Sequence, residues 1–149
     1  MTRDVDTHDG IKAAIEALVP KSLDDIIRKN RDRAQIYLST PGELAALAAP
    51  GLIVDRQASI KGVLREWSFV TLKVGRVPGV ILMGHNVTVG QSWGTSVVAG
   101  IADDLVRTRS GSLYRVDGPS TDQPDLLHLC AMLWTWGVGE SLGVPHIFY

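Results

Sequence analysis

The stretch VLREWSFVTLKVG, residues 63–75, decides the fold class, because here the chain changes from helix-forming to strand-forming composition. β-Branched and aromatic residues with frequent glycine continue after it, in GVILMG (79–84), NVTVG (86–90), TSVVAGI (95–101) and DLVRTRSGSLYRV (104–116). Short runs of this kind, separated by turn residues, are typical of antiparallel strands. The sequence therefore predicts a central antiparallel meander of about five to six short strands, forming a curled sheet or a small open barrel.

The residues before this stretch favour helices. A helical apolar stripe starts at Ile11 and is closed by Pro20, and Ser22 can cap a second helix over residues 22–38. A third helix is predicted for PGELAALAA, residues 41–49, where a preceding threonine, the first-position proline and a glutamate two residues after it form a capping box. We therefore expect two to three N-terminal helices.

A last helix is predicted after Pro119. The chain caps at Asp122 and continues through QPDLLHLCAMLWTWG, residues 123–137, to a stop at Gly137 or Gly139. Apolar residues occupy most of its circumference, so we expect it to be buried. The chain as a whole is predicted to be one α+β domain over residues 1–149, with 1–8 disordered.

Composition excludes several classes of protein. With 45% apolar and 21% charged residues and a net charge of -1, the chain has no overall field that would attract nucleic acid or an anionic membrane. The single cysteine excludes an intramolecular disulfide, the histidines have no zinc-site spacing, and no apolar run approaches the roughly 18 residues of a spanning helix. We expect a soluble cytoplasmic protein with no metal and no cofactor.

Residues 90–94, GQSWG, match the GxSxG motif of a serine hydrolase's nucleophile elbow. An elbow requires a helix directly after the serine, whereas TSVVAGI has the composition of another strand. We therefore interpret the motif as a turn between strands. The alternative is a hydrolase that uses Ser92 or His85 with an acid from the C-terminal half, and His128 is a further catalytic candidate. It predicts that Ser92 lies at hydrogen-bond distance from His85, His128 or His146 in a concave pocket.

Two further side chains leave alternatives open. Trp93 either folds back onto the core or is exposed as a contact residue. Asp125 and His128 are three residues apart on the last predicted helix, where the carboxylate either pairs with the imidazole or caps the helix.

The predicted contact surface lies on the hairpin of residues 104–116. In the expected register, Arg107 and Arg115 share the face opposite Val106, Thr108 and Tyr114. With Arg109 they form a basic patch, and we take these three arginines and Trp93 as the predicted binding residues.

The function that we expect from the sequence is a small cytosolic, non-enzymatic interaction protein of inhibitor, immunity or regulatory type. It would come from a bacterium, phage or mobile element and bind another protein. The hydrolase described above and a nucleic-acid-binding module are the alternatives. The apolar ending VPHIFY, residues 144–149, packs as a strand either on its own domain or on a second subunit, so a homodimer is also left open.

Overall fold

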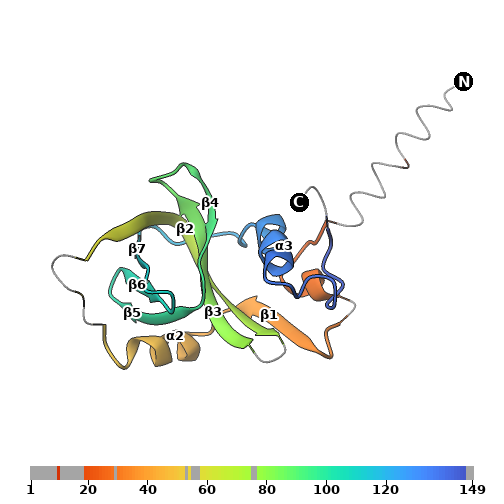
Figure 1. Ribbon diagram of the computed structural model, residues 1–149, viewed down its shortest axis with the longest axis horizontal. Helices are drawn as coiled ribbons and strands as arrows, with labels where there is room; N and C mark the ends of the chain where they lie inside the picture. Colours follow the sequence, from red (N-terminus) through yellow and green to blue (C-terminus); the bar gives the residue numbers. More distant parts are fainter. Residues whose placement is uncertain are drawn as a thin grey trace, which may run out of the picture.

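The computed structural model describes residues 10, 19–28, 30–52, 54, 58–74 and 77–146 (Figure 1). The elements in chain order are η1 (Asp24–Ile27), β1 (Ala34–Leu38), α2 (Pro41–Ala48), β2 (Ile60–Val74), β3 (Val77–Asn86), β4 (Gln91–Gly94), β5 (Val98–Ala102), β6 (Leu105–Thr108), β7 (Leu113–Val116) and α3 (Leu126–Thr135). Residues 11–18 of the first predicted helix and the end predicted to be disordered lie outside the described residues.

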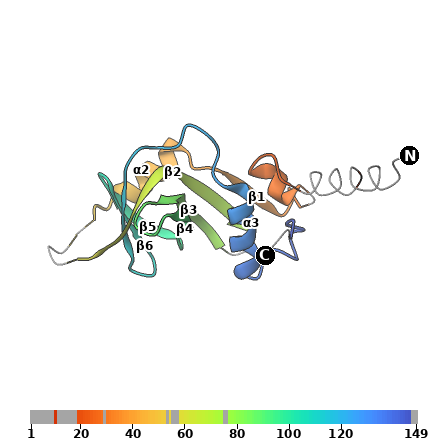
Figure 2. The ribbon, with the colours of Figure 1, turned by 90° about the horizontal axis from the view of Figure 1, so that it is seen from above.

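The strands form one sheet that curls on itself, with α3 on its outer side (Figures 1 and 2). Its order is β4-β3-β2-β7-β6-β5, and β1 pairs with a further part of β2. Every pairing is antiparallel except that of β2 with β7, which is parallel. The predicted meander of five to six short strands is therefore corrected to a sheet of seven strands in the described residues. The strand that the prediction lacks is β1, and the 15 residues of β2 are long enough to pair with β1, β3 and β7.

Residues 69–72 of β2 and 80–83 of β3 are buried on both faces, which separates the apolar residues into two cores. Val70 and Ile81 face the first core, under η1, α3 and the segment that follows α3. Phe69 and Leu82 face the second core, enclosed by β5, β6 and β7 with α2 packed against it. Because successive side chains of a strand point to opposite faces, strands this apolar can supply both cores at once.

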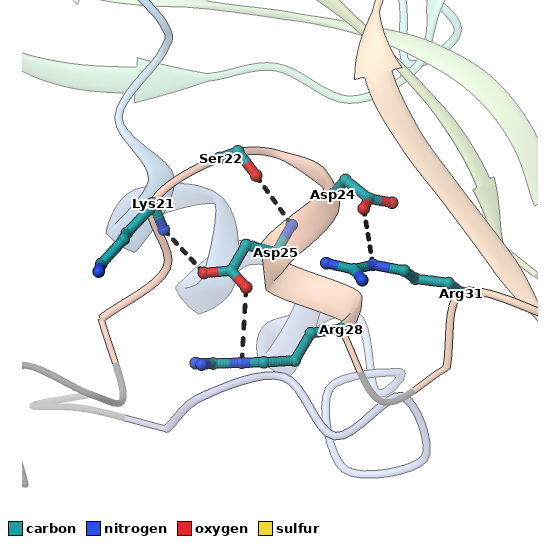
Figure 3. Close-up of polar contacts among 6 residues, drawn as sticks. All are labelled: Lys21, Ser22, Asp24, Asp25, Arg28 and Arg31. Atoms are coloured by element: carbon teal, nitrogen blue, oxygen red, sulfur yellow. Dashed lines mark hydrogen bonds and ion pairs between the residues drawn. The ribbon is translucent and has the colours of Figure 1, made fainter.

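The predicted second helix begins as expected but ends after one turn. Ser22 Oγ accepts a hydrogen bond from the backbone nitrogen of Asp25 at 3.1 Å (Figure 3). Ion pairs join Arg28 to Asp25 at 3.8 Å and Arg31 to Asp24 at 2.6 Å on the same turn (Figure 3). The bond to Ser22 is present, but the element is the 3-10 turn η1, whose N-cap residue is Leu23 and makes no side-chain capping bond.

Residues 34–38, the rest of that predicted helix, form strand β1. The prediction of two to three N-terminal helices is wrong, since α2 and the single turn η1 are the helical elements that precede β2 in the described residues from 19 onward. Ala34 and Ile36 are buried with the two-residue period of a strand. Local helix propensity is weak, and the five residues of β1 instead pair with β2, where β-branched and aromatic side chains pack well.

Other local predictions agree with the structure. Thr40 and Glu43 form the capping box of α2, with bonds of 3.2 and 2.9 Å. Gly111 has φ 93° in the β6–β7 hairpin loop. The C-terminal helix is present as α3, capped by Asp125 instead of Asp122 and followed by Gly137 at φ 81°. Within the described part of the chain, no helix is both long and apolar enough to cross a membrane.

The carboxylate of Glu43 ties α2 to the sheet. It accepts hydrogen bonds from Tyr37 Oη at 2.9 Å and from Thr71 Oγ1 at 3.1 Å, in addition to the capping bond from the backbone of Thr40. These bonds favour the charged form, the one from Thr40 most strongly, and they outweigh burial, so the pKa of Glu43 lies below its usual range.

A lowered pKa of Glu43 predicts how stability depends on pH. The ionised carboxylate stabilises the fold above the pKa that this group has in the unfolded chain, and the contribution is lost as the pH falls through the lower pKa of the folded state. We expect Glu43→Gln to lower the urea midpoint at pH 7 and the difference from wild type to shrink at acidic pH. Glu140→Gln, at an exposed position, is the control, and a difference for Glu43→Gln that does not change with pH would contradict the prediction.

Candidate functional site

The three catalytic candidates from the sequence meet at one edge of the sheet. His85 on β3 lies directly opposite Ser92 on β4, so the two side chains are on the same face. The turn between the strands spans residues 87–90, and Gly90 closes it with φ 73° and a 2.8 Å bond from its nitrogen to the carbonyl of Asn86. The motif therefore contributes a turn through its first glycine, while its serine lies in a strand.

Ser92 contacts a histidine from a distant part of the chain. Its Oγ is 2.9 Å from Nδ1 of His128, in the first turn of α3. Asp125 Oδ1 accepts a bond from the backbone nitrogen of His128 at 3.0 Å, so this carboxylate caps the helix. In the part of the chain that the structure describes, no carboxylate is hydrogen-bonded to the imidazole of His128, and the arrangement is a dyad.

Gly94, the second glycine of the motif, allows this contact. A Cβ at that position would overlap the Sδ and Cε atoms of Met132. Ser92 is two residues before Gly94 on one face of β4, and His128 is four residues before Met132 on one face of α3. Close packing of Met132 on Gly94 therefore places the imidazole beside the hydroxyl.

Ser92 lines a polar hollow of about 530 Å³, whereas His128 does not. His85, Glu66 and the segment 119–125 also line this hollow. Glu66 lies at the bulge of β2 opposite β3 and has φ 49°, a left-handed conformation that is uncommon for a residue other than glycine. The segment is held to the bulge by a 2.9 Å bond from the nitrogen of Ser120 to a β2 carbonyl.

Trp93 lies on the other face of β4, away from the hollow. Its side chain is half-buried against the second core, and its Nε1 donates a hydrogen bond to Tyr114 Oη at 3.2 Å. Of the two alternatives left open by the sequence, the structure has the indole folded onto the core.

The three arginines of the hairpin do not gather into one free patch. Arg115 is paired with Asp104 at 3.2 Å, and Arg109 lines a separate hollow beside α2. Arg107 is half-buried, and its Nε has no hydrogen-bond partner among the described residues. The predicted register is nevertheless present, since Val106 pairs with Tyr114.

No group of three or more histidine, cysteine, aspartate or glutamate side chains in the described ranges is placed to hold a metal ion. Comparisons of the chain with models of protein families, with curated proteins and with solved structures found no match.

Sequence reasoning named Ser92, His85 and His128 but missed what surrounds them. It gave Gly94 a turn role, whereas the glycine makes room for Met132. It also missed the bulge at Glu66, for which no pattern in the strand composition provides a signal.

The packing of α3 on Gly94 can be tested by adding one methyl group. We expect Gly94→Ala to destabilise the protein by about 1–2 kcal/mol, because Met132 has to move, and to weaken the contact between Ser92 and His128. Urea unfolding would measure the first effect and the imidazole NMR signals of His128 the second. Gly100→Ala is the matched control, since its Cβ would meet Leu52 Cδ1 at an ordinary 3.5 Å. Equal effects of the two changes would contradict this explanation.

Proposed function

We propose that the protein is a small serine hydrolase acting on esters, with Ser92 as nucleophile and His128 as general base. The observation that supports it is the 2.9 Å separation of Ser92 Oγ and His128 Nδ1 at the border of a hollow. Nucleophilic serines are activated by a base at this distance. The proposal requires the His128 tautomer with hydrogen on Nε2, so that Nδ1 accepts the serine proton.

The proposed reaction has two halves. Ser92 Oγ attacks the ester carbonyl carbon while its proton passes to His128 Nδ1, and the carbonyl oxygen becomes an oxyanion. When the intermediate collapses, the alcohol leaves with that proton and the acyl group stays on Ser92. Water then attacks the acyl carbon, gives one proton to His128, and the serine leaves with it. The products are one acid and one alcohol.

His85 pairs directly with Ser92 across strands β3 and β4. In a directly opposite pair such as His85 and Ser92 the Cβ atoms are about 5 Å apart, within reach of a ring N–H. We assign it the role of a donor to the oxyanion.

The dyad sets an upper limit on the rate that we expect. Loss of the carboxylate that orients the histidine lowers kcat of a serine protease by about 10⁴-fold. An imidazole without such a partner should therefore turn over activated esters slowly and leave peptide bonds intact.

Labelling and kinetics test the proposal together. We expect a fluorophosphonate probe to label the wild type at Ser92, and Ser92→Ala to lose both the label and the hydrolysis of p-nitrophenyl acetate. His128→Asn should lower kcat by about 10²–10⁴-fold, the usual contribution of a general base. Ser141→Ala, an exposed serine outside the hollow, is the control. Hydrolysis that survives Ser92→Ala unchanged would refute the proposed role of this serine.

A non-enzymatic interaction protein is the second candidate function. The exposed indole of Trp136, 43% accessible at the end of α3, favours it, because tryptophan is enriched among residues that dominate binding interfaces. The labelling experiment separates the two candidates, since this function requires no reactive serine. For either function we propose a cytoplasmic location, which the single cysteine supports.

A further inference from the structure

An apolar hollow lies at the far end of α3 from the dyad. It has a volume of about 310 Å³ and is lined mainly by Leu72, Val97, Leu133, Trp136 and Val138. Leu72 and Leu133 are buried members of the first core, whereas Trp136 is 43% exposed. We call this hollow the apolar groove.

The apolar groove adjoins a hollow that His128 lines. This third hollow, of about 230 Å³, is also lined by Met132 and shares Ser96 and Trp136 with the apolar groove. His128 is in turn bonded to Ser92, which lines the polar hollow. The dyad therefore stands between the polar hollow, which Ser92 lines, and the two adjoining hollows beside α3, the first of which His128 lines.

The spacing along α3 sets the length of a ligand that would span it. His128 and Trp136 are eight residues apart, which corresponds to about 12 Å of helix axis. An extended chain advances about 1.2 Å per bond, so about ten bonds cover that distance.

We propose that the apolar groove binds the acyl chain of an ester whose carbonyl carbon lies at Ser92, and that the preferred chain has about eight to ten carbons. The inference rests on the proposed function and names its substrate class. The alcohol part of the ester would lie in the polar hollow, beside Glu66 and Asp122, where a polar group keeps its hydrogen bonds.

Binding tests the apolar groove without any turnover. Decanoate is titrated into Ser92→Ala by calorimetry, with acetate as the short-chain comparison. We expect decanoate to bind and acetate not to bind. Adding Trp136→Ala to the Ser92→Ala variant should weaken decanoate binding about tenfold, because the change removes one wall of the apolar groove. Leu127→Ala is the matched control, because Leu127 is an exposed leucine of α3, 38% accessible, that lines none of the three hollows. No decanoate binding, or equal loss in both variants, would overturn the inference.

Chain-length kinetics test the link to catalysis. Each methylene that enters an apolar site is expected to raise kcat/KM up to about fourfold. We expect kcat/KM for p-nitrophenyl esters to rise from acetate to decanoate and then level off, and Trp136→Ala to lower the decanoate-to-acetate ratio about tenfold. If the enzyme is active but its kcat/KM does not depend on chain length, the inference about the apolar groove is overturned and the proposed function is not. Decanoate binding with no Ser92-dependent hydrolysis would overturn the proposed function and leave the apolar groove supported as a binding site.

Discussion

The pairing of β2 with β3 is the contact on which the rest of this structure depends. Residues 69–72 of β2 and 80–83 of β3 are buried on both faces, so each strand supplies alternate side chains to the core under α3 and to the core inside the curled sheet. All the other layers pack on this pair or on strands that extend it. The part of a strand pair that serves two cores has no solvated face, and this explains the apolar run of VILM at residues 80–83.

A second constraint, smaller in extent, positions the candidate site. Met132 can lie on β4 only because Gly94 has no side chain, and the same close approach brings His128 to Ser92. The two glycines of the motif thus have separate physical roles. Gly90 adopts the left-handed backbone of the turn, and Gly94 leaves space for the helix. The GxSxG motif is typical of a strand–turn–helix elbow, whereas here it lies at a turn and in the strand that follows. Its serine, Ser92, nevertheless contacts His128.

How well a structural feature can be predicted from the sequence depends on how far apart its interacting residues are along the chain. Capping boxes and hairpin loops depend on neighbours within a few residues, and the ones predicted at Thr40 and Gly111 are present. Residues 34–38 satisfied a helical pattern locally, but the energy of pairing with β2, which comes from residues far along the chain, made them a strand. Trp93 was open to two interpretations for the same reason, because its partner Tyr114 lies on another hairpin.

The sequence by itself determined the mixed α and β composition, the strand-forming half from residue 63, the caps of α2, and the candidate residues Ser92, His85 and His128. Only the tertiary structure decided which of them meet. Ser92 and His128 are 36 residues apart, and their 2.9 Å contact results from the docking of α3 on β4. Periodicity shows which face of an element is apolar, but side-chain packing determines which elements those faces contact and in what register.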